Sequence, residues 1–184
     1  MKLWRKLIIR LLIGTGFLLL FLLSDSNIFL ICFISLLCIN ELIRLNCKKY
    51  NKHLFKEFRL YLKEKERKKF STIPLFFIGI LLPLLFFERK IAVAAVLFLI
   101  YGDFFAELIG TKFGKIKIFR KKSLEGSLAC FGSCVIIGLI LNLGWILILV
   151  GSLAATLSEL YSELMKIDDN LAMGMIAGLV MSLV

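Results

Sequence analysis

The chain alternates between long apolar stretches and short segments rich in Lys and Arg, and no other feature constrains its fold as much. A helix needs about 20 mostly apolar residues to cross the hydrocarbon layer of a bilayer. Hydrophobic residues make up 60% of the 184 residues, and the mean hydropathy is +0.91. We therefore predict one domain over residues 1–184, an all-α, polytopic integral membrane protein of about seven transmembrane helices. The spans are expected near residues 7–23, 28–45, 73–87, 91–109, 124–143, 145–165 and 171–184.

The distribution of basic residues predicts the orientation of these spans. Residues 46–72, 110–122 and 166–170 lie between spans and are expected in the cytoplasm, where Lys and Arg accumulate. Only Arg89 and Lys90 of the 24 basic residues then face outward, which leaves 22 (24 − 2) inside or near the inner interface. The first span is expected to be uncleaved, with a cytoplasmic N-terminus and with Arg10 snorkelling to the interface. We expect a multi-pass protein of a prokaryotic inner membrane with its active site on the cytoplasmic face.

The largest polar segment, residues 46–72, holds ten Lys or Arg against three Glu between Lys48 and Lys69. Apolar side chains recur within it at helical spacing. This pattern predicts an amphipathic, basic helix that lies on an anionic leaflet. A solvated charged loop remains the alternative.

Several classes of function find no support in the sequence. The net charge of +11 could suggest a nucleic-acid partner, but the basic residues sit between the apolar runs, which indicates membrane topology instead. The single His53 makes a catalytic triad or a His metal site improbable. The five cysteines form no CxxC pair, so neither a zinc site nor a disulfide framework is predicted.

The segment 101–128 departs from the apolar runs on either side of it. Asp103 and Glu107 are one helical turn apart and share a face of the helix. A basic, glycine-spaced loop over residues 110–122 follows, and Ser123 can then cap the next helix. Carboxylates can hold a divalent metal, lysines can meet phosphates, and a helix start offers amides to an anion. The segment predicts a site for a magnesium-bound nucleotide; a positive-inside loop with two incidental acids is the alternative.

The predicted topology also gathers acids on one side of the membrane. Eight of the 13 fall in or beside the cytoplasmic half of a span: Glu41, Asp103, Glu107, Glu125, Glu159, Glu163, Asp168 and Asp169. Carboxylates at that depth are expensive unless paired, hydrated or metal-bound, so they are functional candidates. Simpler readings remain: Asp168, Asp169 and Asn170 could only cap the last helix, and Glu41 could only pair with Arg44.

Three motifs in this arrangement resemble the polytopic lipid kinases, a family that includes dolichol kinase, phytol kinase and the CTP-dependent diacylglycerol kinase. They are Tyr101-Gly102-Asp103, Gly110-Thr111-Lys112-Phe113-Gly114-Lys115 and Lys121-Lys122-Ser123-Leu124-Glu125-Gly126-Ser127. Weaker matches are Glu41-Leu42-Ile43-Arg44, Ala154 to Glu159, Asp168-Asp169-Asn170-Leu171 and Gly178-Leu179-Val180. The resemblance covers nearly the whole chain from the second span onward.

The resemblance implies Mg²⁺-dependent transfer of the γ-phosphoryl group of CTP to a lipid alcohol, such as a polyprenol or dolichol, a phytol-like alcohol or diacylglycerol. We assign Mg²⁺ to Asp103 and Glu125, with Asp168 or Asp169 completing the shell or deprotonating the hydroxyl. Lys112, Lys121 and Lys122 are expected to face phosphates, and amides after Ser123, including that of Gly126, to cradle one. Glu107, Glu159 and Asn170 are expected to support the site.

Two positions depart from the family pattern, and other functions stay open. Glu107 replaces a residue that is usually small in the family, so it could add or misplace a metal ligand. Gly174 replaces a common proline and is expected to soften the start of the last span. The same resemblance extends to phosphatidate cytidylyltransferases, which make CDP-diacylglycerol. A transporter or a membrane scaffold is the remaining alternative.

Overall fold

The computed structural model describes residues 3–24, 72–119, 122–165 and 168–184. The predicted second span and residues 46–71 of the predicted amphipathic segment lie outside the described residues. The chain divides into two units, Met1–Leu19 with Phe76–Val184, and Leu20–Leu75. In the second unit, the described residues are helix ends, where the Ser24 hydroxyl donates to the carbonyl of Leu20 over 2.7 Å. Everything that follows concerns the first unit.

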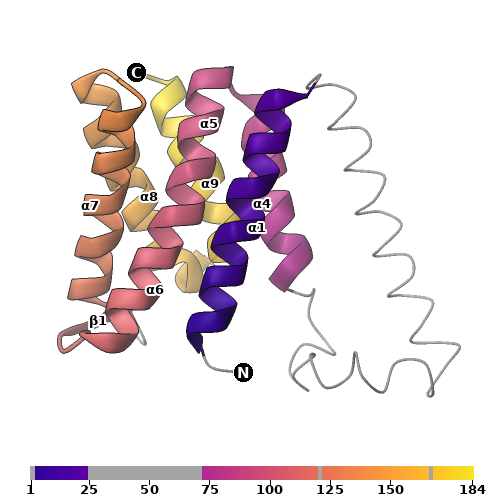
Figure 1. Cartoon of the computed structure of the whole chain (residues 1–184). Coiled ribbons are helices and arrows are strands. Elements are labelled where there is room, and N and C mark those ends of the chain that lie inside the picture. The colour runs from indigo at the N-terminus through magenta and orange to yellow at the C-terminus, as the bar shows by residue number, and fades with distance from the viewer. Residues whose placement is uncertain (1–2, 25–71, 120–121, 166–167) are drawn as a thin grey trace, which may run out of the picture. The chain divides into compact units, whose positions relative to one another are not determined.

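The described residues are mostly helical, which confirms the helical part of the prediction. Figure 1 shows α1 (Leu3–Leu23), α4 (Thr72–Phe86), α5 (Arg89–Leu97), α6 (Asp103–Lys112), α7 (Leu124–Ile140), α8 (Trp145–Met165) and α9 (Asp169–Ser182). Within the described residues, two helical stretches are long and apolar enough to cross a membrane, Arg89–Lys112 and Trp145–Ser162, and four others are apolar but shorter. Seven spans remain a prediction.

Two local features differ from the all-α prediction. A π-helical turn, η2 (Phe98–Gly102), joins α5 to α6 within one continuous helix. The predicted basic loop contains an antiparallel pair of strands, β1 (Lys117–Phe119) and β2 (Lys122–Ser123). The amide of Leu124 donates to the carbonyl of Ile116 over 2.9 Å, so this hairpin runs directly into the start of α7. The loop is therefore a folded connection that fixes the place of Lys122.

The first unit buries polar side chains and exposes apolar ones. Glu159 is 3% exposed and Asn170 1%, whereas Phe86 is 70% exposed and Ile140 72%. In a water-soluble protein the tendency is the opposite. Charged residues there lie mostly on the surface, and they are almost never fully buried unless they are paired. This distribution favours a bilayer around the helices, with the polar chemistry kept inside the bundle.

Glycines set how closely the helices around this interior approach. A Cβ at Gly79 of α4 would collide with the backbone carbonyl of Asn170, and one at Gly174 of α9 would lie 2.9 Å from the carbonyl of Gly79. Likewise a Cβ at Gly126 of α7 would lie 2.9 Å from the carbonyl of Ala106 and 3.1 Å from Cα of Gly110. Gly174 therefore serves close packing of α9 on α4, a role that the sequence analysis did not assign to it.

Candidate active site

Charged side chains from five elements of the first unit meet in one network inside the helices. Arg10 comes from α1, Asp103 and Glu107 from α6, Lys122 from β2, Glu159 from α8, and Asp168, Asp169 and Asn170 from the start of α9. α8 packs against both α7 and α9, and α6 packs against α7, which brings these distant parts of the sequence together. We call this set the charged cluster.

Arg10 links the acids of α6 to the start of α9. Its Nη2 lies 3.1 Å from Oδ2 of Asp103, and its Nη1 lies 3.7 Å from Oε2 of Glu107. The same Nη2 donates to Oδ1 of Asn170. The guanidinium carbon also lies 5.1 Å from the centre of the Phe76 ring, within cation–π range. Arg10 therefore pairs with the buried Asp103 and the half-exposed Glu107, partners that the predicted snorkelling to the interface did not include.

Lys122 faces two other acids. Its ammonium donates to the buried carboxylate of Glu159 and lies 3.6 Å from Oδ2 of Asp169. Burial alone would lower the pKa of Lys122, but the charges of Glu159, Asp169 and Asp103 outweigh burial, so the pKa is raised above its ordinary value. Lys122 therefore stays an ammonium at neutral pH, in the place where the sequence analysis expected a phosphate-facing lysine.

The start of α9 separates the roles of its two aspartates. Asp168 is the N-cap, and its Oδ1 accepts from the amide of Asn170 at 3.1 Å and from Nδ2 of Asn170 at 2.6 Å. Asp169 also accepts from Asn170, but its second oxygen points to Lys122. The capping interpretation therefore describes Asp168, whereas Asp169 turns one carboxylate oxygen into the charged cluster.

Asp103 sits directly after the π-helical turn. Such a turn inserts an extra residue into the helix and occurs often at functional sites. A Cβ at Gly102, the last residue of the turn, would collide with the methyl group of Met173 and lie 3.2 Å from Sγ of Cys130 and of Cys134. The end of the turn therefore packs closely against α7 and α9, and the next residue, Asp103, contacts Arg10 of α1.

Glu125, the second predicted magnesium ligand, is used differently. Its Oε1 accepts from the amides of Lys115 and Ile116 at 3.0 and 3.2 Å, which ties the basic loop to the first turn of α7. In this structure the Glu125 carboxylate stabilises the loop. The sequence pattern does not predict these bonds, because the fold of the hairpin decides where the two amides point.

The amides expected to cradle a phosphate already have partners within the protein. The amide of Leu124 donates to Ile116, and the amide of Gly126 donates to the hydroxyl of Ser123 over 3.3 Å. Ser123 thus acts as a helix cap. The predicted cradle formed by Ser123 and Gly126 is closed in this structure, and Gly126 instead permits close contact of α7 with α6.

The remaining predicted residues fall at the edge of the cluster or beyond the described residues. Lys112 is exposed at the end of α6, with Nζ 5.5 Å from the ring centre of Trp4 and 5.2 Å from that of Phe113. Lys121 and Glu41 lie outside the described residues, as does the side chain of Glu163.

The donor set of the cluster suits a hard divalent cation. Five carboxyl groups (Asp103, Glu107, Glu159, Asp168 and Asp169) stand against two cations, Arg10 and Lys122, so acidic groups outnumber basic ones. Mg²⁺ prefers oxygen ligands and needs only one or two from the protein. Among the described residues, no three Asp, Glu, His or Cys side chains already form a metal-holding group. One or two carboxylates of the cluster could therefore supply oxygen ligands to Mg²⁺.

Arg10 is a member of the charged cluster that sequence reasoning did not place at the site. One signal could have found it, because a charged side chain inside an apolar span is expensive unless it has a partner. A search for partners would have led from Arg10 to the acids of the other spans. The direction in which α1 turns its residue 10 is set by packing, which the sequence pattern leaves open.

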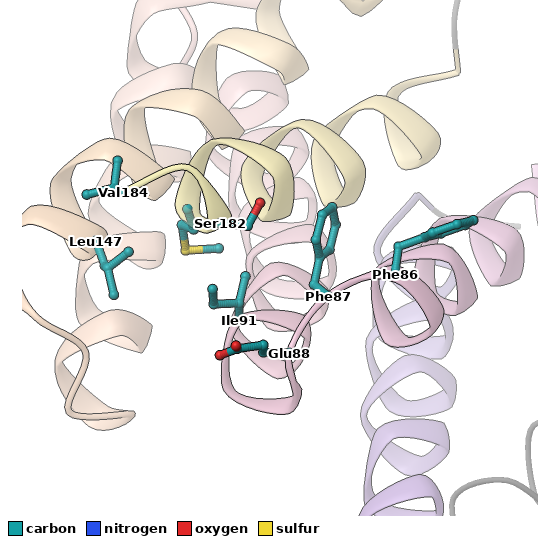
Figure 2. Close-up of a pocket in the computed structure, with 8 residues that line it drawn as sticks. Phe86, Phe87, Glu88, Ile91, Leu147, Ser182 and Val184 are labelled. Carbon is teal, nitrogen blue, oxygen red and sulfur yellow. The ribbon is translucent and has the colours of Figure 1, made fainter.

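A pocket lies at the other end of the same helices. It has a volume of about 390 Å³, and Figure 2 shows the residues that line it: Phe86, Phe87, Glu88, Ile91, Leu147, Met181, Ser182 and Val184. Glu88 is the one ionisable side chain among these eight. The cavity offers no cation to a phosphate and no second acid to a metal, so it does not compete with the charged cluster as a site for nucleotide chemistry.

Comparison with known proteins gives three relatives. An uncharacterized protein of Rickettsia prowazekii is 28% identical over 141 residues, covering 72% of this chain and 69% of that protein. The CTP-dependent diacylglycerol kinase 1 of Saccharomyces cerevisiae is 30% identical over 98 residues, or 52% of this chain and 34% of the kinase. That of Schizosaccharomyces pombe is 32% identical over 93 residues, or 50% of this chain and 43% of the kinase.

No family model matches the chain, and no solved structure does. The chain spans between one third and one half of the length of the two kinases. The partial similarity supports a relationship to CTP-dependent lipid kinases, over half of the chain and at low identity. Together with the apolar helices it suggests a kinase of membrane-associated character.

Proposed function

We propose that the protein is an integral membrane lipid kinase that transfers the γ-phosphoryl group of CTP to a lipid alcohol, with diacylglycerol as the first candidate. The observation that carries the proposal is the convergence of Asp103, Lys122 and Asp169 from three different elements inside an apolar bundle. Two relatives whose names describe CTP-dependent diacylglycerol kinases support the donor and the acceptor. Polyprenol, dolichol and phytol-like alcohols are further candidate acceptors.

The residues of the cluster divide the work of phosphoryl transfer, which needs positioning and charge neutralisation more than covalent chemistry. Asp103 would hold Mg²⁺, which when bound neutralises charge on the phosphate oxygens. Lys122 would leave Glu159 and Asp169 and bind the phosphates, and the exposed Lys112 would attract the nucleotide at the mouth of the site. Glu125 would act indirectly, by holding the loop that carries Lys122.

The reaction balances without any further reactant. The oxygen of the lipid hydroxyl attacks the γ-phosphorus, and the bond from that phosphorus to the oxygen bridging it to the β-phosphorus breaks. CDP leaves with the electron pair of that bond. Asp169 would accept the hydroxyl proton through the carboxylate oxygen that it turns into the charged cluster. We propose that the site opens to the cytoplasm and that the lipid enters sideways between the helices.

A phosphatidate cytidylyltransferase would use the same nucleotide and the same kind of charged site. Its acceptor is a lipid phosphate, and CMP stays on the product. Lys122 and Arg10 could serve a phosphate of either substrate, so the charged cluster alone favours neither reaction. The similarity to two yeast CTP-dependent diacylglycerol kinases favours the kinase.

The test is to incubate the purified protein with diacylglycerol, Mg²⁺ and CTP that is labelled in either the α or the γ phosphate. A kinase moves only the γ label into the lipid and makes phosphatidate. The same incubation with phosphatidate as acceptor tests the alternative, in which the α label enters the lipid. If neither label reaches any lipid alcohol or phosphatidate, the proposal is wrong.

A further inference from the structure

Arg10 has no assigned role in the proposed reaction, although it lies within the charged cluster. It is the cation on α1 that reaches both acids of α6 and, through Asn170, the start of α9. Asn170 is itself held in place by hydrogen bonds from its Nδ2 to Asp168 and Asp169. Arg10 therefore stands between the two acidic groups of the charged cluster and reduces their mutual repulsion.

Arg10 and a metal on Asp103 would compete for the same carboxylate. The guanidinium lies 3.1 Å from Oδ2 of Asp103, and the side chain of Asp103 is only 12% exposed. Two cations so close together in a site of low dielectric repel each other strongly. Arg10 consequently has to give way when Asp103 takes a divalent cation.

A phosphate group of the nucleotide would be a suitable second partner for the side chain of Arg10. The guanidinium presents a planar fork of donors that matches a phosphate group better than a single ammonium does. Its side chain is 28% exposed, so it is not enclosed on all sides. The guanidinium lies 5.1 Å from the centre of the Phe76 ring, and this cation–π contact can stabilise it while it changes partner.

We propose that Arg10 is an exchangeable counter-ion: it neutralises Asp103 while the site is empty, and it binds a phosphate of the nucleotide once Asp103 holds the metal. This inference rests on the proposed function, since it takes the ligand to be a metal-bound nucleoside triphosphate. It assigns Arg10 a direct contact with substrate in one state and a direct contact with a metal ligand in the other.

If Arg10 exchanges partners in this way, its removal should change the affinity for Mn²⁺ and the affinity for CTP in opposite directions. In Arg10→Met, Asp103 loses its competing cation, so Mn²⁺ without nucleotide should bind about tenfold more tightly. The same variant lacks a charged phosphate ligand, so the Mn²⁺-bound form of CTP should bind about tenfold or more weakly. Mn²⁺ binding is measured by electron paramagnetic resonance of the free ion, and CTP binding by equilibrium dialysis at saturating Mn²⁺, both without turnover.

Two further variants keep the test clear. Arg10→Lys keeps the charge without the fork, so Mn²⁺ affinity should stay near that of the wild type while CTP affinity falls. Arg5→Met removes an exposed cation of the same helix and should change neither value more than about twofold. If Arg10→Met does not fold, the Arg10→Lys split still decides the matter.

The outcomes distinguish this inference from the proposed function. If both affinities fall together, or Mn²⁺ affinity does not rise, Arg10 only holds the helices together and the exchange is wrong. If CTP affinity is unchanged in Arg10→Met and Arg10→Lys, Arg10 does not reach a phosphate and the exchange is again wrong. If the wild-type protein binds no Mn²⁺-bound CTP at all, the proposed function fails rather than this inference.

Discussion

The two ends of the helical unit are built from the same helices but hold different chemistry. The continuous helix Arg89–Lys112 begins beside the pocket of Figure 2 and carries Asp103 toward its other end. α8 begins beside the same pocket at Leu147 and reaches the charged cluster at Glu159. At one end the pocket is lined mostly by apolar residues, with the exposed Glu88 as its one ionisable side chain. At the other end, five carboxylates and two cations contact one another in the charged cluster. This difference favours the charged end as the place of nucleotide chemistry.

The largest expected difference between the two ends appears when one acid is neutralised at each end. Asp103→Asn removes the proposed metal ligand and should lower γ-phosphoryl transfer by about 10³-fold, the upper range for loss of a group that stabilises transition-state charge. Glu88→Gln, at the pocket, should leave the rate unchanged. Both are measured at saturating Mg²⁺ in the same detergent or vesicle preparation. Near-normal turnover by Asp103→Asn would remove Asp103 from the mechanism.

A cation at each end gives the next comparison. Lys122→Ala should cost about 3 kcal/mol of transition-state stabilisation, more than 100-fold in rate, if its ammonium meets developing phosphate charge. Lys90, whose ammonium donates to the backbone of Asn142 over 3.1 Å, is the matched lysine at the pocket end. Lys90→Ala should change the rate less than twofold, because the pocket end takes no part in the reaction. Equal losses in both variants would show that Lys122 is not a phosphate ligand.

The two neighbouring aspartates at the start of α9 allow a capping role and a catalytic role to be compared within the charged cluster. Asp169→Asn removes the proposed proton acceptor and should lower the rate by about 100-fold. Asp168→Asn should keep near-normal activity, since Asn caps a helix about as well as Asp does. Rates and thermal unfolding are measured for both proteins. Full activity in both variants would show that Asp168, Asp169 and Asn170 only cap the helix.

A smaller effect is expected from the packing that holds α9 against α4. Gly79→Ala would push a methyl group into the carbonyl of Asn170 and should destabilise the fold by about 1–3 kcal/mol. Gly132→Ala on α7 adds a methyl group with nothing within 4 Å and should stabilise by about 0.5–1 kcal/mol. Thermal unfolding of the two variants checks the sign. Equal shifts would mean that α9 does not need this close contact.

The sequence predicted the helices and the meeting of acids, because both follow from patterns along the chain. Apolar runs define the helices, and alternating topology brings Asp103, Glu159 and Asp169 to the same side whatever the details of packing. The structure places α8 at Trp145–Met165, the bounds that the apolar run predicts. The count of seven spans and their orientation stay predictions.

Other parts of the site depend on contacts that no pattern along the chain encodes. The partners of Arg10 follow from how α1 is rotated, and the partners of Glu125 follow from a hairpin of five strand residues. The π-helical turn before Asp103 also leaves no mark in apolar periodicity. Sequence reasoning therefore found which residue types gather, but not the hydrogen bonds that Glu125 accepts from two backbone amides. The assignment of Glu125 to a metal stays a prediction.

The central claim, that the metal-bound nucleotide sits at the charged end, can be tested by proximity. A nitroxide is attached in turn to cysteine at Lys115, in the loop before β1, and at Trp145, which is exposed at the start of α8. The native cysteines are first replaced, and the broadening of the nitroxide signal by Mn²⁺-bound CTP is recorded for each protein. The account predicts strong broadening at position 115 and little at position 145, since Trp145 lies 14 residues (159 − 145) before Glu159, about 21 Å along α8. Stronger broadening at position 145 would contradict it.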